Sequence, residues 1–262
     1  ALMNGIDKGE LISPALTFET INRFAKTMKS NVKRIPMDNK IGIDLDRTAE
    51  SVGSRTKLIY LCNPNNPTGS IMGTDQLESF CKTMSKKSIV FVDEAYHEYV
   101  THPDYRSMID LVKKGHNVMV SRTASKVHGL AGLRVGFAIT TPEIAKRLES
   151  YLTDSLNVIG LRAAIASYQD ERFQAHSIEQ NNRAKKIVTN HLDNKGIEYL
   201  NSQTNFIFIK TGMNIAKFQP AMEKNGVIVG RPFPPYNKWC RLSMAKPEEM
   251  ENFNTGMDRV LG

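Results

Sequence analysis

The segment with the clearest chemical potential spans residues 121–136, Ser-Arg-Thr-Ala-Ser-Lys-Val-His-Gly-Leu-Ala-Gly-Leu-Arg-Val-Gly. It combines small hydroxyl side chains, glycines that permit close approach of the backbone, and the guanidinium of Arg134. Hydroxyl and guanidinium groups together can bind a phosphate. Lys126, the single lysine of the segment, can form a Schiff base with an aldehyde if its surroundings lower its pKa. The segment therefore predicts a phosphate site with a reactive amine beside it.

A second chemical group is Asp93, which begins the run Asp-Glu-Ala-Tyr directly after the apolar residues 89–92. A carboxylate at the buried end of a strand is costly unless it is paired. A protonated ring nitrogen is one suitable partner. The alternative is that Asp93 caps a following helix, since aspartate is a favoured N-cap residue.

A third segment, residues 63–69, reads Asn-Pro-Asn-Asn-Pro-Thr-Gly. Each Asn-Pro step disfavours helical backbone at the asparagine, so the segment predicts a rigid loop. Such rigidity suits a loop that must hold an amide side chain in place.

The elements that must position these groups alternate along the first half of the chain. Short apolar strands separated by helices predict a mostly parallel sheet that is covered on both faces. Asn63, Asp93 and Ser121 each follow the last apolar residue of a strand, where active sites of such sheets lie. We expect strands at 10–13, 32–36, 58–62, 89–92, 118–120 and 135–139, and helices at 18–28 and 75–84.

The second half has a different pattern, which predicts a smaller α+β domain. A long helical stretch is expected over 143–192, with breaks near 157–160 and Asp170. Pro247 followed by two glutamates predicts the start of a closing helix. The remaining expected elements are strands at 206–209, 227–229 and 239–244, and helices at 215–225 and 247–261. We place a large domain with its connecting helix at 1–169 and the small domain at 170–262.

Composition excludes several other classes. The 262 residues have the apolar and charged content of an ordinary globular protein, and no apolar run is long enough to cross a bilayer. The net charge of +8 comes from scattered lysines and arginines, and aromatic residues do not interleave with basic runs, so nucleic-acid binding is not indicated. No metal-ligand spacing is present. Three widely spaced cysteines without a CxxC motif favour free thiols in core strands and a reducing cytoplasm.

The three segments together resemble the hallmark motifs of class I and II, fold-type-I aminotransferases, which depend on pyridoxal 5′-phosphate. The motifs are CNPNNPTG, VDEAY and SRTASKVHGLAGLRVG, in this order, and the similarity extends over essentially the whole chain. The form SK-x-x-GLAGLR is especially similar to the histidinol-phosphate aminotransferase branch. The resemblance implies a three-layer α/β/α large domain, a small C-terminal α+β domain, and a homodimer.

The resemblance also implies roles for residues of the cofactor site. Lys126 matches the lysine that carries the cofactor, and Asp93 the carboxylate that pairs with its pyridine nitrogen. Tyr96 and Asn66 match the groups that hydrogen-bond its phenolic oxygen. Its phosphate contacts match Thr123, Ser125 and Arg134. Phe18 falls where the family has an aromatic residue, most often Tyr, that stacks on the ring.

For the substrate, the resemblance implies that Arg241 binds the α-carboxylate. Asn205, in an Asn-Phe pair, matches a position at the start of the small domain with a less defined role. The residues after Arg241 have no glycine where relatives often have one. This departure concerns the substrate and leaves the cofactor roles unchanged.

An N-terminal portion of the family is not matched in this sequence. It comprises an arm, a first strand that pairs with residues 135–139, and a Gly/Ser-rich turn whose helix N-terminus binds the cofactor phosphate. The chain starts just after that turn, inside the helix. We expect a fragment of a normal enzyme, with a natural truncation as the alternative.

The implied activity is transfer of an amino group between an L-amino acid or amine and a 2-oxo acid. Histidinol phosphate with 2-oxoglutarate is the family's namesake pair, and aromatic amino acids are the next candidates. One alternative is decarboxylation of a phosphorylated amino acid on the same cofactor. The other is a non-catalytic remnant that kept the fold and lost the cofactor.

Overall fold

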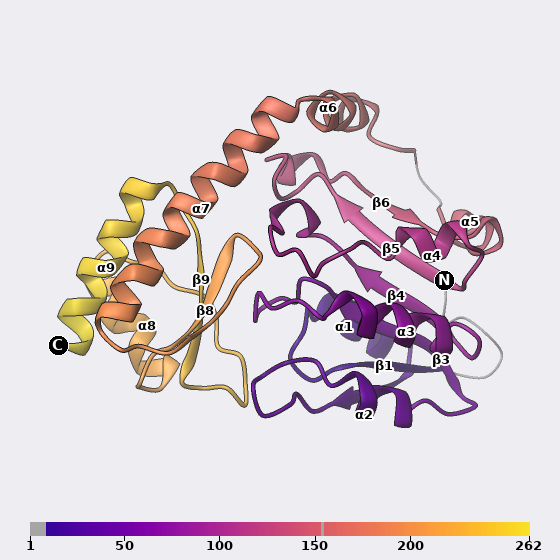
Figure 1. Cartoon of the computed structure of the whole chain (residues 1–262), viewed down its shortest axis with the longest axis horizontal. Coiled ribbons are helices and arrows are strands. Elements are labelled where there is room, and N and C mark those ends of the chain that lie inside the picture. The colour runs from indigo at the N-terminus through magenta and orange to yellow at the C-terminus, as the bar shows by residue number, and fades with distance from the viewer. Residues whose placement is uncertain (1–8, 153–154) are drawn as a thin grey trace.

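The computed structural model describes residues 9–152 and 155–262, and in these residues it contains two sheets that belong to two units (Figure 1). The larger sheet has the strand order β2-β1-β3-β4-β5-β6, and the smaller has the order β7-β8-β9. In the larger sheet every neighbouring pair is parallel except β5 with β6, which is antiparallel. Its strands are β1 (Glu10–Pro14), β2 (Asn31–Ile35), β3 (Thr56–Cys62), β4 (Ile89–Asp93), β5 (Val118–Thr123) and β6 (Gly136–Ile139).

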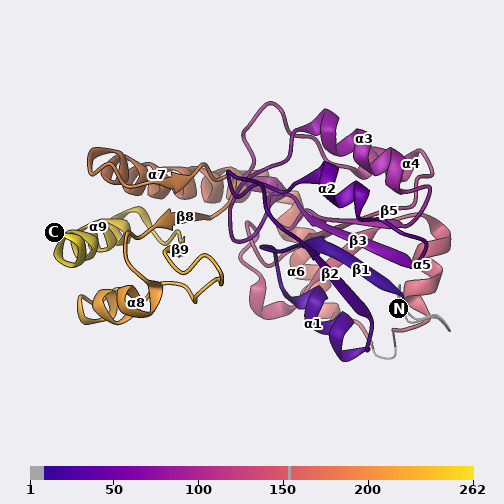
Figure 2. The same cartoon turned by 90° about the horizontal axis from the view of Figure 1, so that it is seen from below.

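Helices cover both faces of the larger sheet (Figure 2). Alternate side chains of each strand point to opposite faces, so one strand contributes to two cores. Ile59 and Leu61 of β3 pack with α2 (Leu45–Glu50), α3 (Thr74–Met84) and α4 (Ile109–Lys113). Leu58, Tyr60 and Cys62 of the same strand pack on the other face, with α1 (Thr20–Thr27) and α5 (Pro142–Glu149).

The smaller sheet is antiparallel and carries its own core. Its strands are β7 (Tyr199–Leu200), β8 (Phe206–Lys210) and β9 (Trp239–Ser243), and it packs against α7 (Glu171–Asn194), α8 (Ile215–Lys224) and α9 (Pro247–Leu261). Ile207, Phe218 and Phe253 are fully buried in this core. The connecting helix α6 (Val158–Gln169) precedes α7 and packs beside the segment that follows β5.

Two apolar clusters join the units. In one, Leu16 and Met37 of the larger unit pack with Phe208 and Trp239 of the smaller. In the other, Tyr96 and Val127 pack with Phe206, the first residue of β8. These contacts bring the start of β8, in the small sheet, against the carboxyl ends of the strands of the large sheet.

Most expected elements are present, with boundaries shifted by one to a few residues. The expected fold class, α/β with a mostly parallel central sheet, is confirmed. The expected breaks in the long helical stretch are also present, since Asn157 and Asp170 cap α6 and α7 by accepting from Gly160 N and Phe173 N. In the sheet, β6 is an edge strand. The expectation for the first residues, that the chain starts within a helix, falls on residues 1–8, outside the described residues.

Two expectations were wrong. Residues 227–229 are described and form no strand, because Val227 N donates to Met222 O and closes α8 instead of joining a ladder. Cys81 lies in helix α3, not in a strand, although it is buried and free as expected. The short helix α2 was not expected; it lies in a largely polar stretch and is capped by Asp44, which accepts from Arg47 N.

Candidate active site

The carboxyl ends of three adjacent strands place Asp93 in a hydrogen-bonded group. The register pairs Cys62 with Asp93 and Asp93 with Ser121. Ser121 Oγ donates to Asp93 Oδ1 at 2.7 Å, and Tyr60 OH donates to Oδ2 at 2.9 Å. All of these side chains lie on the face that α1 and α5 cover, because they follow the same two-residue period. Both oxygens of Asp93 are therefore held from neighbouring strands.

Burial raises the pKa of Asp93, and the hydrogen bonds from Ser121 and Tyr60 lower it, as does the nearby charge of Lys126. Donors aimed at both oxygens favour the charged form of a carboxylate. The helix-cap alternative is not supported. Asp93 accepts from Ala95 N at 3.3 Å, but the 3-10 helix that follows, His97–Tyr99, has Tyr96 as its N-cap and no side-chain cap.

Lys126 lies in the turn that follows β5, within electrostatic reach of Asp93. Its Nζ is 5.1 Å from the centre of the Tyr96 ring. Burial lowers the pKa of Lys126, the positive charges of Arg241 and Arg134 lower it further, and Asp93 opposes them. A lysine in such surroundings yields the neutral amine more readily than a free lysine does.

The three expected phosphate contacts flank Lys126. Thr123 Oγ1 donates to Val135 O at 3.3 Å and accepts from Ser125 N at 3.1 Å, which ties the turn to the segment before β6. Arg134 has left-handed backbone (φ 57°), is exposed, and donates from Nη1 to Ala131 O at 2.8 Å. The Arg134 guanidinium is thus held by a local contact, and its charge reaches Lys126.

The loop at residues 63–69 is held rigidly against the loop that carries Phe18. Asn65 Nδ2 donates to Leu16 O and to Thr68 Oγ1, both at 3.0 Å, and Thr17 Oγ1 donates to Asn65 Oδ1 at 2.8 Å. Phe18 itself is 44% exposed.

Asn66, the next residue of the loop, bridges the two units. Its Nδ2 donates to Tyr96 OH at 3.4 Å, and its Oδ1 accepts from Arg241 Nη1 at 3.1 Å. Asn66 and Tyr96 are buried. One amide thus contacts both the ring expected at the cofactor and the guanidinium expected at the substrate.

Arg241 comes from the middle of β9 and lies over Phe206, with its guanidinium carbon 5.0 Å from the ring centre. Its Nε is buried and has no hydrogen-bond partner among the described residues. Asn205 directly precedes β8, and its carbonyl accepts from Met244 N at 2.8 Å. The structure therefore brings Arg241 to Asn66, while the observed hydrogen bond of Asn205 is a backbone contact within the small sheet.

Two supporting groups were missed in the sequence. Tyr60 was interpreted as an ordinary strand residue. The signal that could have found it is its position two residues before Cys62, on the same face as Asp93. The second is the buried ion pair of Arg122 with Glu94 (2.8 Å), which lies on the opposite face and holds the ends of β4 and β5 together.

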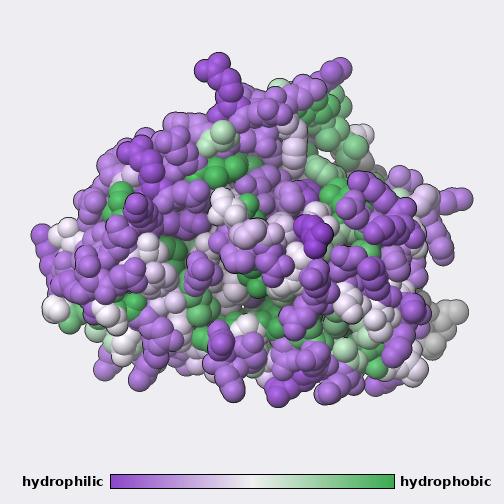
Figure 3. Space-filling view, viewed as in Figure 1, coloured by the Kyte–Doolittle hydropathy of each residue, from purple (hydrophilic) through white to green (hydrophobic). Residues whose placement is uncertain are grey.

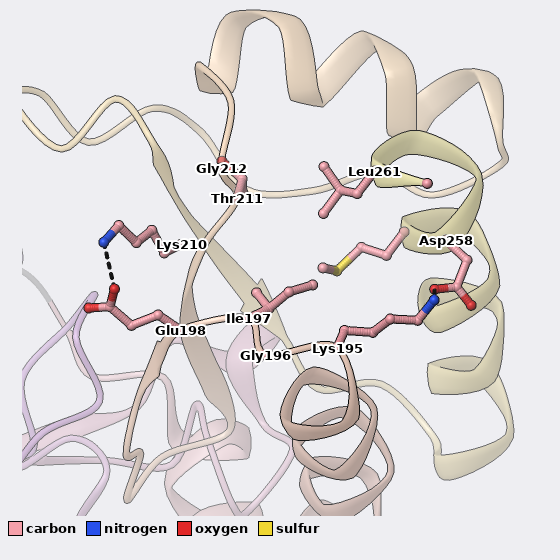
Figure 4. Close-up of a pocket in the computed structure, with 11 residues that line it drawn as sticks. Lys195, Gly196, Ile197, Glu198, Lys210, Thr211, Gly212, Asp258 and Leu261 are labelled. Atoms are coloured by element: carbon pink, nitrogen blue, oxygen red, sulfur yellow. Dashed lines mark hydrogen bonds and ion pairs between the residues drawn. The ribbon is translucent and has the colours of Figure 1, made fainter.

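A separate pocket lies in the small unit, away from these residues (Figure 4). It has a volume of about 490 Å³, and the ends of α7, β8 and α9 form it. Its lysines already have carboxylate partners: Lys195 with Asp258 at 2.9 Å and Lys210 with Glu198 at 2.5 Å. The pocket is thus lined by lysines that are already neutralised by carboxylates.

No group of three or more histidine, cysteine or acidic side chains in the described residues could hold a metal ion. Within residues 9–152 and 155–262, each helix is too short or too polar to span a bilayer.

The large parallel sheet has Asp93 at a strand end and Lys126 in the turn after β5, and the small sheet brings Arg241 to Asn66 beside them. The comparison with protein families is direct: the chain belongs to the class I and II aminotransferase family, whose model matches residues 2–255. This family depends on pyridoxal 5′-phosphate.

The individual relatives carry names from the same family. The chain is 35% identical over 224 residues to histidinol-phosphate aminotransferase 2 of Hydrogenovibrio crunogenus, which covers 84% of this chain and 60% of that protein. A solved structure from Erwinia carotovora atroseptica, provisionally called a histidinol-phosphate aminotransferase, matches with a TM-score of 0.92 and 32% identity, over 96% of this chain and 74% of that one. The Sinorhizobium meliloti enzyme in complex with pyridoxal 5′-phosphate matches in fold, with a TM-score of 0.87 and 24% identity over 96% and 70% of the two chains.

Proposed function

We propose that this protein binds pyridoxal 5′-phosphate and transfers an amino group between an L-amino acid or amine and a 2-oxo acid. Histidinol phosphate or an aromatic amino acid is the proposed donor, and 2-oxoglutarate the proposed acceptor. The observation that carries the proposal is that Asp93 and Lys126 lie at one end of the large sheet and that Arg241 reaches the same place from the small sheet through Asn66. The names of the relatives support the choice of donor.

The residues present fit this cofactor. Asp93 has a hydrogen-bonded carboxylate that can face a protonated ring nitrogen, and Lys126 has a partly buried amine with a lowered pKa. Tyr96 and Asn66 would hold the phenolic oxygen, and Phe18 would cover the ring. Thr123, Ser125 and Arg134 would bind the phosphate. When bound, the cofactor withdraws electrons from the substrate's Cα.

Side chains of this protein would transfer the proton and orient the substrate. Lys126, once displaced by the substrate's amine, would take the proton from Cα as a general base. Arg241 would bind the α-carboxylate through two parallel hydrogen bonds and so orient the Cα–H bond. Its unpartnered Nε and its contact with Asn66 support this role. Asn205 would help to shape this end of the site.

The test is the absorbance of the purified protein with added pyridoxal 5′-phosphate. We expect a visible band of lysine-bound cofactor in the wild type and in the control Lys113→Ala, an exposed lysine on α4, and none in Lys126→Ala. Lys126→Ala should also lower kcat by on the order of 100-fold or more, as expected for loss of a general base. Absence of the band in the wild type would instead favour a non-catalytic remnant.

A second measurement separates transamination from decarboxylation. Product should form only when a 2-oxo acid is supplied. Carbon dioxide release without a 2-oxo acid would instead identify a decarboxylase.

We further propose a homodimer in the cytoplasm. Large apolar side chains are exposed on α6, where Val158 and Ile159 are 67% and 78% exposed, and hydrophobic surface gathers in this region (Figure 3). Exposed apolar surface of this kind supports a protein contact. The three cysteines are free and buried, which fits a reducing compartment. Light scattering on the purified protein measures the oligomeric state.

A further inference from the structure

Lys185, on α7, is a half-buried lysine outside the proposed catalytic site. Its Nζ donates a hydrogen bond to Ser202 O at 3.0 Å. No carboxylate lies within ion-pair distance of it among the described residues. The neighbouring small-unit lysines Lys195 and Lys210 differ, because each contacts a carboxylate (Figure 4).

A buried ammonium without a counter-ion has a cost. Lysine is rarely buried unless it is paired, because removing its charge from water is unfavourable. Burial is the only cause that lowers the pKa of Lys185, to about 8. The pKa in the unfolded chain is higher, so this group destabilises the folded state below pH 8, and the cost disappears as the pH rises from 8 toward the unfolded value. A side chain that destabilises the folded state is best explained by the segment whose position it determines.

Lys185 holds the turn at 202–205 that leads into β8. Ser202 Oγ also donates to Phe206 O at 2.5 Å, and Asn181 Nδ2, one turn before Lys185 on α7, donates to Thr204 O at 3.2 Å. The turn is thus fixed from the side of the small unit.

The other side of the same turn contacts the loop that carries Asn66. Gln203 N donates to Gly69 O at 2.8 Å, and Gln203 Oε1 accepts from Thr101 N at 2.9 Å. Gly69 has left-handed backbone (φ 74°), and a Cβ there would lie 2.3 Å from Ser202 Oγ, so the two segments touch closely. Lys185, the turn and the loop form a continuous series of contacts that ends at Asn66 and Arg241.

We propose that Lys185 is a positioning residue: its ammonium fixes the turn at 202–205 against the loop at 63–69 and thereby sets the place of Arg241 relative to Asn66. The effect of Lys185 on substrate binding rests on the function proposed above. The positioning of the turn at 202–205 by Lys185 does not depend on that function.

Charged groups near Lys185 do not contribute to its pKa shift. The side chains of residues 201–205 are all amides or hydroxyls. On α7, Arg183 and Lys186 are exposed. In the loop after Thr101, Asp104 accepts from Thr74 N and its own N–H donates to His102 Nδ1, so both groups have local partners.

The experiment compares Lys185→Met with Lys186→Met, the adjacent exposed lysine, in the full-length protein. Amide hydrogen exchange without ligand is the first measurement. We expect the amides of Gln203 and Thr101 to exchange about tenfold faster in Lys185→Met, as for loss of a hydrogen bond from a charged donor, and to be unchanged in Lys186→Met. The Tm at pH 7 should stay equal or rise, because a buried unpaired charge is removed. Equal exchange in the two variants overturns the proposal, as does a fall in Tm that accounts for the faster exchange.

Steady-state kinetics then test the link to the substrate. Lys185→Met should raise KM for the amino donor several-fold with kcat within about twofold. In the wild type KM should rise between pH 7 and 9.5 as the ammonium is lost, and in Lys185→Met KM should not follow this rise. Lys185→Arg, which stays charged, should restore low KM at high pH. If the wild type does not transaminate, the proposed function fails, and the exchange measurement still decides the role of Lys185 in the turn.

Discussion

The two sides of the candidate site are built differently. On the side of the large sheet, Asp93 accepts from Tyr60, Ser121 and Ala95, all from the same unit. On the side of the small sheet, Arg241 donates across the units to Asn66, and its Nε has no partner among the described residues. The carboxylate is fully held before any ligand binds, whereas the guanidinium keeps a free donor.

We propose that this difference separates the places of the two ligands. A carboxylate whose two oxygens accept hydrogen bonds from both neighbouring strands is fixed in position. Such a group suits a cofactor that stays bound through many turnovers. A buried donor without a partner carries a desolvation cost that an anionic substrate removes when it binds. The three predictions that follow test this comparison, from the largest expected effect to the smallest.

The largest effect is expected at the fixed side. Asp93→Asn keeps the shape of the side chain but removes its charge, so it can no longer pair with a protonated ring nitrogen. Loss of one partner of a buried charge pair costs about 2–5 kcal/mol, so kcat/KM should fall by about 30-fold or more. The control Asp110→Asn changes an exposed aspartate on α4 and should have wild-type kinetics. A loss below about fivefold in Asp93→Asn would contradict the proposed pairing.

An intermediate effect is expected at the open side. Arg241→Lys keeps a positive charge but loses the planar fork that binds a carboxylate through two hydrogen bonds. We expect KM for the amino acid to rise about tenfold, with a smaller change in kcat, and the cofactor absorbance to stay unchanged because the positive charge near Lys126 is kept. Arg259→Lys, an exposed change on α9, serves as the control. If cofactor binding fell as much as substrate binding, the assignment of the two sides would be wrong.

The smallest effect is expected at Tyr60. Tyr60→Phe removes one of the donors to Asp93 and leaves the packing against Phe91, whose ring centre is 5.3 Å away. Loss of one hydrogen bond should lower the free energy of unfolding by about 1 kcal/mol. Because that bond favours the charged carboxylate, the pKa of Asp93 should rise, and its carboxyl NMR signal should titrate at higher pH. An unchanged titration would show that Tyr60 does not support Asp93.

The sequence predicted the strands of the large sheet and the closing helix well, because apolar runs and the Pro247 start signal are local features. It also placed Asp93 and Ser121 at one edge, since both follow buried strands. The strand expected at 227–229 was wrong because the apolar side chains of Val227 and Val229 pack in the core, while the backbone N–H of Val227 is used to end α8.

The role of Tyr60 could not be predicted in the same way. A tyrosine in an apolar strand is compatible with plain packing, and only the register between β3 and β4 brings its hydroxyl to Asp93. The contact of Arg241 with Asn66 joins residues 175 positions apart, and no local pattern contains such information.

Helix α7 has a mechanical consequence. Its 24 residues make a rod about 36 Å long at 1.5 Å per residue. Near its start it follows the connecting helix of the large unit, while its second half is part of the small core (Figure 1). A stiff lever of this length converts a tilt of about 5° at one end into a displacement of about 3 Å at the other, so a slight change at α6 would shift the small core, which includes β9, relative to the large sheet.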